Sequence, residues 1–143
     1  MFPHFKEFAD HKEKIAVVGM GYIGLPLAVL LGQKYKVLGF DINLSRIQEL
    51  NRYYDRTGEV NSEAIISSGI EFTSSPQNLA QTRFIIIAVP TPVDLYHVPN
   101  LNPLIEASRT VGSNMSADSV VVFESTVYPG ATEDVCVPVI EKE

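Results

Sequence analysis

Apolar residues along the chain fall into short runs separated by polar and turn-forming residues. Three of these runs predict strands that are buried on both faces of a sheet: KIAVV (14–18), RFIIIAV (83–89) and VVVFE (120–124). Continuous apolar runs, rather than strict alternation, are typical of a parallel sheet covered by helices. Two weaker runs, YKVLGF (35–40) and IEFT (70–73), predict two further strands.

Segments of helical character lie between the predicted strands, at 22–34, 45–54, 61–68, 102–115 and 131–142, with a short helical turn at 76–82. Asn43 or Ser45 is suited to cap the second of these helices. Strands and helices that alternate in this way predict an α/β fold in which helices cover both faces of a doubly wound, mainly parallel sheet. We expect residues 1–12 to form an arm or lead-in helix, and residues 13–143 to form one domain.

Residues 15–32, IAVVGMGYIGLPLAVLLG, carry no charge and are long enough to be considered as a membrane span. However, Gly19, Gly21 and Gly24 interrupt this run, and Pro26 follows. A short strand, a glycine turn and a shorter helix therefore explain the segment better than one continuous span.

The three glycines have the spacing G-x-G-x-x-G directly after a predicted strand, and they open a predicted helix. Gly19 lets the chain turn tightly, Gly21 lets the backbone approach a pyrophosphate, and Gly24 permits close packing of helix on strand. The N-terminus of the helix then offers N–H groups and a partial positive charge to the phosphates. The motif predicts a Rossmann-type dinucleotide site.

Asp41 ends the next predicted strand, 22 residues after Gly19 and close to the expected spacing of about 20. A carboxylate there accepts hydrogen bonds from both ribose hydroxyls of an adenosine and repels a 2′-phosphate, which favours NAD over NADP. Arg46, one helical turn further on, either accommodates a phosphate or lies along the adenine. The alternative interpretation is that Asp41 caps a helix beside a merely tight turn.

Ligands of open α/β sheets collect at the carboxyl ends of the strands. Two strand ends are unusual here, AVPTPVD (88–94) and FESTVYPG (123–130). We expect Thr91 and Thr126 to face the nicotinamide half of a cofactor, where Thr126 orders a water or donates to a substrate oxygen. Glu124 either orients polar groups there or satisfies backbone N–H groups. The alternative is that these residues only form turns.

Composition narrows the class of protein. The 143 residues carry a net charge of −6, which argues against a general nucleic-acid or anionic-membrane surface. The single cysteine, Cys136, excludes an intrachain disulfide framework and fits a reducing cytoplasm. Its valine neighbours and the lack of a cationic residue nearby in sequence predict a structural thiol.

The histidines offer little chemistry. His97 is expected to be a solvated loop residue rather than a base, and His4 and His11 lie in the predicted arm. No pair of histidines has metal-ligand spacing, so no metal site is predicted.

Four motifs, taken in order, resemble the N-terminal domain of the UDP-glucose/GDP-mannose dehydrogenases: VGMGYIGLPLA, GFDIN with SRIQEL, FIIIAVPTPV and ESTVYPGATEDVCVPVIE. The resemblance covers residues 13–143. The ESTVYPG and VPTPV forms look most like the enzymes that oxidise UDP-N-acetylglucosamine or UDP-N-acetylgalactosamine, which serve bacterial surface-polysaccharide synthesis.

The resemblance implies oxidation of a sugar C6 alcohol to a carboxylate with two NAD⁺, through a thiohemiacetal on a catalytic cysteine. By motif position, the pyrophosphate is held by Gly19, Gly21, Tyr22, Ile23 and Gly24. The adenosine side is held by Asp41 and Arg46. The nicotinamide end is lined by Thr91, Glu124 and Thr126. Thr126 matches a threonine that helps to hold a catalytic water.

The family's nucleophilic cysteine lies in later domains, and Cys136 does not match it. We therefore expect the chain to be a fragment that does not turn over alone and that lacks a sixth strand, the central dimer helix and most of the UDP-sugar site. The longer protein is expected to be a cytoplasmic homodimer or higher oligomer. Two alternatives stay open: a stand-alone NAD-sensing regulatory module, and an enzyme for UDP-glucose or GDP-mannose.

Overall fold

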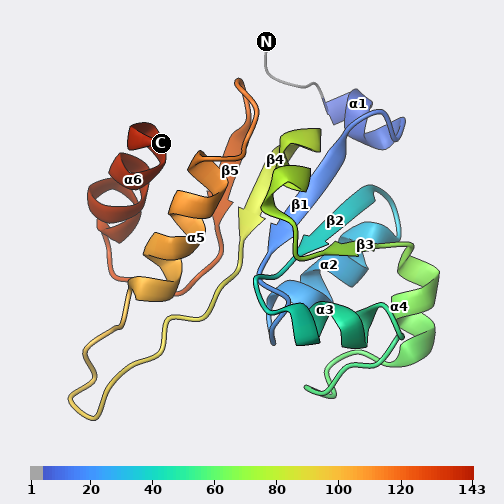
Figure 1. Ribbon diagram of the computed structural model, residues 1–143, viewed down its shortest axis with the longest axis horizontal. Coiled ribbons are helices and arrows are strands. Elements are labelled where there is room, and N and C mark those ends of the chain that lie inside the picture. Colours follow the sequence, from blue (N-terminus) through green and yellow to red (C-terminus); the bar gives the residue numbers. More distant parts are fainter. Residues whose placement is uncertain (1–4) are drawn as a thin grey trace.

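A five-stranded parallel sheet with strand order β3-β2-β1-β4-β5 forms the centre of the molecule (Figure 1). The computed structural model describes residues 5–143. The strands are β1 (Lys14–Val18), β2 (Lys36–Phe40), β3 (Glu71–Thr73), β4 (Thr82–Ile87) and β5 (Val120–Phe123). The chain crosses from β2 and β3 on one side of β1 to β4 and β5 on the other, which creates a point of divergence at the carboxyl ends of β1 and β4.

Helices cover both faces of this sheet. The α-helices are α1 (Phe5–Ala9), α2 (Gly24–Gly32), α3 (Leu44–Leu50), α4 (Ser62–Ser68), α5 (Asn102–Gly112) and α6 (Val137–Lys142). A 3₁₀-helix, η1 (Pro76–Gln81), precedes β4, and a π-helical turn, η2 (Thr132–Cys136), leads into α6. The predicted doubly wound α/β fold is confirmed.

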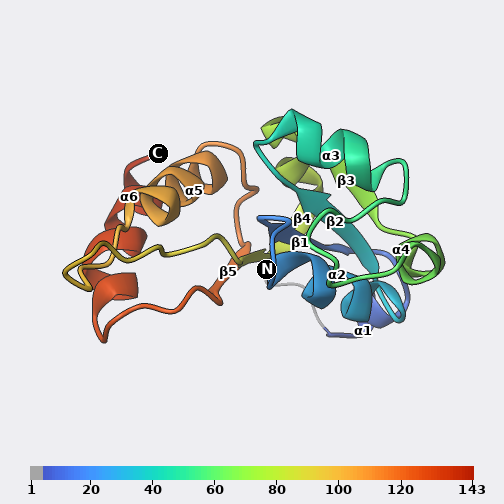
Figure 2. The ribbon, with the colours of Figure 1, turned by 90° about the horizontal axis from the view of Figure 1, so that it is seen from below.

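Alternate residues of the central strands β1, β2 and β4 enter two separate cores. On β1, Ile15 and Val17 pack with residues of α1, α2 and α4, whereas Ala16 and Val18 pack against α5. This alternation requires apolar residues at every position of a central strand, which explains the continuous runs in the sequence. In Figure 2, α5 and α6 lie on one side of the sheet and α2 on the other.

Strand β5 differs from the prediction that it is buried on both faces. All four of its residues are only half-buried, because β5 is an edge strand that pairs with β4 alone. The apolar sequence of β5 is compatible with burial, but the burial of a strand also depends on whether it has a neighbouring strand on both sides.

Several predicted helices also have different limits. Those predicted at 45–54 and 102–115 end earlier, at Leu50 and Gly112. The helix after the glycine turn begins at Gly24 rather than at residue 22, since Tyr22 and Ile23 belong to the turn. The helix expected at 131–142 begins with the π-helical turn η2. Pro138 follows that turn and has no N–H group for a regular helical hydrogen bond. Asn43, as predicted, caps α3, and its side chain accepts a hydrogen bond from the Arg46 N–H.

The segment between β4 and α5 projects away from the body of the molecule (Figures 1 and 2). It is held by an antiparallel bridge between Val93 and Pro99 and by the carboxylate of Asp94, which accepts hydrogen bonds from the backbone of Tyr96 and Val98. His97 lies exposed at its tip.

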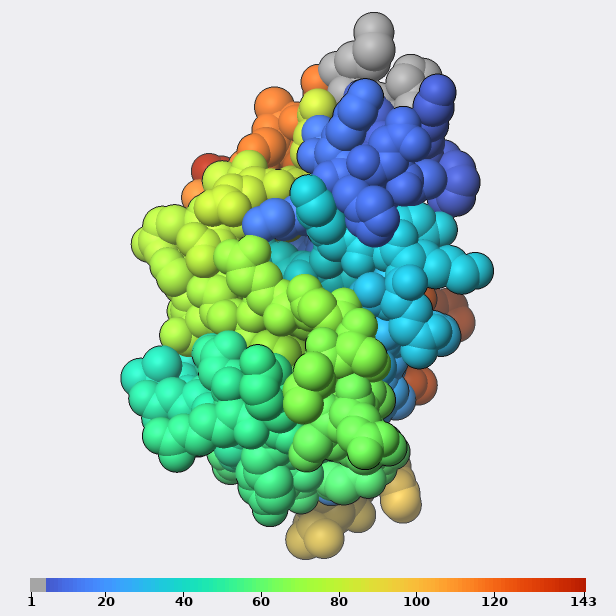
Figure 3. Space-filling model, turned by 90° about the vertical axis from the view of Figure 1, so that its right-hand side faces the viewer, coloured from blue at the N-terminus to red at the C-terminus, as the bar shows by residue number. Residues whose placement is uncertain are grey.

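The opposite end of the molecule is occupied by α1, as Figure 3 shows. Phe8 of α1 is buried against the ring of Phe84, with ring centroids 6.0 Å apart. His4 lies outside the described residues, and His11 is exposed. No helix in residues 5–143 has the length and apolar content that crossing a membrane requires.

Candidate functional site

The turn between β1 and α2 depends on two of its glycines for its shape. Gly19 has a φ of +97°, which favours glycine. A Cβ on Gly24 would lie 1.7 Å from the carbonyl oxygen of Gly19, so the start of α2 packs directly on the turn. Gly21 differs, because no described atom beyond its chain neighbours lies within 4 Å of the position of such a Cβ. The chain is therefore open at Gly21.

Asp41 lies at the carboxyl end of β2 and is joined to the glycine turn. Its Oδ2 accepts a hydrogen bond of 2.8 Å from the Met20 N–H, and its Oδ1 accepts one of 2.8 Å from the Asn43 N–H. A carboxylate oxygen can accept more than one hydrogen bond, so both oxygens keep acceptor capacity. The turn and the acid predicted from sequence thus meet in one place.

Arg46 is buried beneath this turn. Its Nε donates to the carbonyl oxygen of Met20 at 2.8 Å, and its Nη1 and Nη2 donate to Glu49 at 3.0 Å and to Asp55 at 2.7 Å. Only 6% of its side chain is exposed. Contact of Arg46 with an adenosine stays a prediction, and the contacts present make it a support of the glycine turn.

Asp55 was not singled out in the sequence. Its fully buried carboxylate also accepts hydrogen bonds from Thr57 and from the N–H groups of Glu59 and Val60. Burial alone would raise the pKa of Asp55, but the hydrogen bonds from Thr57 and Arg46 outweigh burial and lower that pKa to about 2. The only sequence signal was a D-x-T pattern suited to a turn.

Two cavities flank the glycine turn at the carboxyl edge of the sheet. The larger, of about 440 Å³, lies between the end of β2 and α5 and is lined mainly by apolar groups. Its lining residues are Val18, Gly19, Gly21, Phe40, Asp41, Ile42, Val89, Pro90, Pro103, Glu106, Ala107 and Thr110. The smaller, of about 170 Å³, lies between the ends of β4 and β5 and is lined by Ile23, Ala88, Val89, Pro90, Thr91, Glu124, Ser125 and Thr126.

The loops after β4 and β5 are tied together by two hydrogen bonds. Thr91 Oγ1 donates to the carbonyl oxygen of Thr126 at 2.7 Å, and Ser125 Oγ donates to that of Val89 at 2.6 Å. Glu124 is exposed, and its N–H continues the β4–β5 pairing by donating to Ile87. The structure therefore brings Thr91, Glu124 and Thr126 together around one cavity, and their contact with a nicotinamide stays a prediction.

The remaining predicted residues of the turn, Tyr22 and Ile23, are exposed at 66% and 62%. Cys136 lies apart from all of these groups and is fully buried among apolar residues that pack on α5. Burial raises the pKa of its thiol, and the Ser108 hydroxyl offsets part of that increase. Its predicted structural role agrees with this position.

A parallel sheet of this order, with a glycine turn into α2 and an acid at the end of β2, defines the Rossmann class of dinucleotide-binding domains. Residues 13–143 match the model of the UDP-glucose/GDP-mannose dehydrogenase family, NAD binding domain. The chain belongs to this family, and its domain is an NAD-binding domain.

Named relatives agree with this assignment. Over 128 residues the chain is 59% identical to Protein CapL of Staphylococcus aureus, with 90% of this chain and 30% of CapL covered. Over 130 residues it is 50% identical to the UDP-N-acetyl-D-glucosamine 6-dehydrogenase of Pseudomonas aeruginosa, with 90% and 31% covered. The chain thus spans about a third of the length of these relatives.

A solved structure has the same architecture. The UDP-D-ManNAc dehydrogenase of Pyrococcus horikoshii superposes with a TM-score of 0.80 at 33% identity, over 90% of this chain and 32% of that one.

Proposed function

We propose that this chain is the cofactor-binding part of a nucleotide-sugar 6-dehydrogenase that oxidises the C6 alcohol of a UDP-N-acetylhexosamine to a uronate with two NAD⁺. The similarity to a UDP-N-acetyl-D-glucosamine 6-dehydrogenase favours this substrate class over UDP-glucose and GDP-mannose. The observation that carries the cofactor half of the proposal is the Asp41 carboxylate, fixed beside the glycine turn by the Met20 N–H.

The residues present fit a dinucleotide. The glycine turn is open at Gly21, where a pyrophosphate needs close approach to the backbone. Cavities lie on both sides of the turn, a larger apolar one toward Asp41 and a smaller one toward Thr126. The larger cavity is suited to the adenosine half of a dinucleotide, and the smaller cavity to its nicotinamide half.

The proposed roles follow from this fit. The pyrophosphate is held by Gly19, Gly21, Tyr22, Ile23 and Gly24, the adenosine side by Asp41 and Arg46, and the nicotinamide end by Thr91, Glu124 and Thr126. NAD⁺, when bound, supplies the acceptor for the hydride. Thr126 holds a water at the reacting end, and the hydrogen bond from Thr91 to its carbonyl fixes the loop that carries it.

The wider context is proposed in the same way. Residues 1–12 form an arm before the domain at 13–143, and the catalytic cysteine and most of the UDP-sugar site belong to the part of the relatives that this chain does not span. The longer protein acts in the cytoplasm as a homodimer or higher oligomer. The 143-residue chain alone forms no NADH from a UDP-sugar.

Calorimetric titration with NAD⁺ and NADP⁺ tests the cofactor half. We expect the chain to prefer NAD⁺, and Asp41→Ala to weaken NAD⁺ binding roughly tenfold to a hundredfold, since a hydrogen bond to a charged group contributes about 1.5–3 kcal/mol. Asp10→Ala, which removes an exposed carboxylate that lines neither cavity, is the matched control. A folded chain that binds neither nucleotide contradicts the proposal.

The substrate half is tested with a protein of the relatives' full length that contains this chain. NADH formation is compared for UDP-N-acetylglucosamine, UDP-N-acetylgalactosamine, UDP-glucose and GDP-mannose. We expect the highest kcat/KM with a UDP-N-acetylhexosamine. A higher value with UDP-glucose or GDP-mannose contradicts the assigned substrate class.

A further inference from the structure

The helix α2 is apolar on its outer side as well as on the side that packs against the sheet. A surface helix ordinarily carries polar or charged residues on its outer side, but residues 15–32 carry no charge at all. Leu30 of α2 is 63% exposed, and Ile23, which precedes it by two helical turns on the same side, is 62% exposed. Exposed apolar surface of this kind is typical of an interaction site.

Strand β5 is incompletely covered on the side of the sheet where α2 lies. Its alternate residues Val120 and Val122 face that side, and both are only half-buried. Val122 packs against the same core as Leu27 of α2, and Val120 lines an apolar cavity of about 390 Å³ together with Leu31. On the other side of the sheet, α5 and η2 provide the cover (Figure 2).

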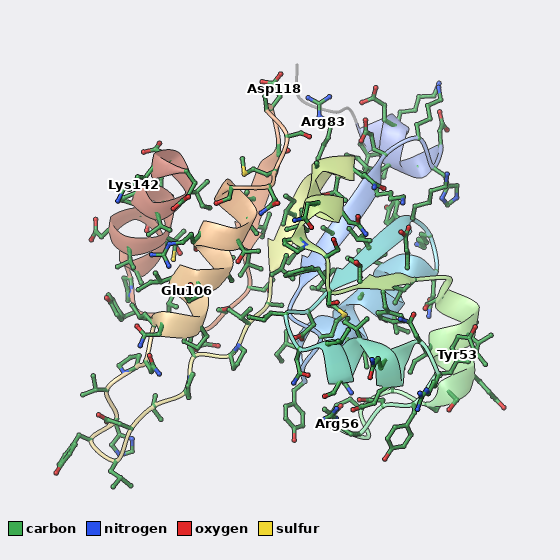
Figure 4. All side chains as sticks on the ribbon, in the orientation of Figure 1. Tyr53, Arg56, Arg83, Glu106, Asp118 and Lys142 are labelled. Carbon is green, nitrogen blue, oxygen red and sulfur yellow. The ribbon has the colours of Figure 1, made fainter. Side chains whose placement is uncertain are left out.

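The exposed side of α2 and the uncovered side of β5 belong to one surface. The cavity of about 390 Å³ joins them at the amino edge of the sheet, and the cavity of about 170 Å³, which Ile23 lines, joins them at the carboxyl edge. A charged pair stands at the starts of β4 and β5, with Arg83 Nη2 and Asp118 Oδ2 3.7 Å apart (Figure 4). We call this surface the open face, and its residues are Ile23, Leu27, Leu30, Leu31, Val120 and Val122.

We propose that the open face is the docking site for the apolar side of a helix, which comes from the part of the same protein that lies outside residues 1–143. The docked helix buries Leu30, covers β5 and ends beside the small cavity at Ile23. The inference rests on the proposed function, because it takes this chain to be the cofactor-binding part of a longer dehydrogenase.

A helix fits this face better than a further strand does. Parallel sheets are covered by helices on both faces. A sixth strand would form hydrogen bonds along the free edge of β5 and would leave Val120 and Val122 uncovered. The helix α2 has nine residues, which make about 13 Å of helix, so about two to three turns of a docked helix match its length.

The position of Ile23 favours a helix of the same protein over a separate partner. Ile23 lies on the open face and also lines the cavity proposed for the nicotinamide end. The part of the protein that carries the UDP-sugar must reach the same cavity for a hydride to be transferred. The chain spans only 30% of CapL and 31% of the Pseudomonas aeruginosa relative, so those proteins hold ample further chain. An apolar surface without charge is also typical of permanent rather than transient contacts.

Labelling at position 30 tests the inference. Leu30→Cys is made in the 143-residue chain and in a protein of the relatives' full length, and mass spectrometry of the peptide that contains position 30 gives its rate of labelling by a maleimide. We expect rapid labelling in the 143-residue chain and roughly tenfold or more slower labelling in the longer protein, because a covered site reacts only when it opens. Ile66→Cys, at a side chain of α4 that is 55% exposed and lies outside the open face, is the matched control and should react equally in both proteins.

Stability supplies a second readout. Leu30→Lys should leave the midpoint of thermal unfolding of the 143-residue chain unchanged, because Leu30 is exposed there. It should lower the midpoint of the longer protein by several degrees, because the docked helix would bury the added charge. Ile66→Lys should change neither midpoint.

The inference is overturned if position 30 is labelled equally fast in the two proteins, or if Leu30→Lys changes the two unfolding midpoints equally. Protection that depends on protein concentration assigns the open face to a second copy and overturns the inference as well. The proposed function fails separately, when the longer protein is folded and forms no NADH from any UDP-sugar, whatever the labelling at position 30.

Discussion

The guanidinium of Arg46 and the carboxylate of Asp55 form a buried ion pair, with Nη2 and Oδ1 2.7 Å apart. The same guanidinium donates through Nε to the carbonyl oxygen of Met20. The loop that follows α3 and carries Asp55 is thereby fixed to the glycine turn. A buried ion pair of this kind gives little net stability when intact, but removing one partner leaves an uncompensated charge.

Asp55→Asn should therefore destabilise the domain strongly. We expect a loss toward the lower end of the roughly 3–5 kcal/mol that breaking a buried pair costs, because Glu49 still contacts Arg46. Urea denaturation followed by circular dichroism measures the change. Thr57→Val is the control, since it removes one hydrogen bond to Asp55 without removing the charge. Equal stability of Asp55→Asn and the unchanged chain would refute the prediction.

The same carboxylate predicts a pH dependence of stability. The pKa of Asp55 falls from an ordinary 3.8 to about 2 in the folded chain. A group whose pKa is lowered by folding stabilises the folded state above its unfolded pKa, and this contribution disappears as the pH falls through the folded pKa. We expect Asp55 to contribute about 2 kcal/mol above pH 4, lost between about pH 4 and pH 2. Asp55→Asn should flatten this part of the stability profile, and an unchanged slope would contradict it.

The glycine turn predicts that stability and nucleotide affinity respond to different substitutions. Gly24→Ala places a methyl group against the Gly19 carbonyl and should cost at least the roughly 1–3 kcal/mol typical of overpacking. Gly21→Ala meets no described atom within 4 Å and should leave unfolding nearly unchanged while weakening NAD⁺ binding. Thermal denaturation and calorimetry of the two variants separate the effects. A stable Gly24→Ala domain, or unchanged NAD⁺ binding by Gly21→Ala, would contradict them.

Much of this turn could be predicted because its signals are local. The apolar run 14–18, the glycine spacing and Asp41 depend on neighbours in sequence, and the parallel sheet then brings the turn and the acid together. The same holds for Thr91 and Thr126, since adjacent parallel strands β4 and β5 end at one edge.

The environment of Arg46 could not be predicted in this way. Residues 55–60, DRTGEV, have the composition of an exposed turn. Asp55 becomes buried only because the loop folds back onto α3 and Thr57, Glu59 and Val60 supply donors. The half-burial of β5 is likewise a property of its edge position, which its own sequence does not contain.

The link between the loops after β4 and β5 predicts a selective effect on the nicotinamide end. Thr91→Val removes the hydrogen bond to the Thr126 carbonyl, worth about 1 kcal/mol. Under the proposed roles, it should weaken binding of NAD⁺ several-fold and leave binding of ADP, which lacks the nicotinamide, unchanged. Thr132→Val, at a threonine that lines neither cavity, is the matched control. Equal weakening of both ligands by Thr91→Val would argue for a general loss of structure.

The buried position of Cys136 predicts that its thiol is protected from chemical modification in the native chain. The side chain is fully buried, and burial raises the pKa of the thiol, so little thiolate forms near neutral pH and what forms is inaccessible to a reagent. Labelling with an aromatic disulfide should be slow in the native chain and should reach one thiol per chain in denaturant, since Cys136 is the only cysteine.

The labelling rate of the native chain should rise with urea in parallel with unfolding, because reaction requires opening of the packing between η2 and α5. Asp55→Asn, which destabilises the domain from the opposite side of the sheet, should accelerate labelling if the whole domain opens as one unit. Rapid labelling of the native chain at neutral pH would contradict the burial of this thiol.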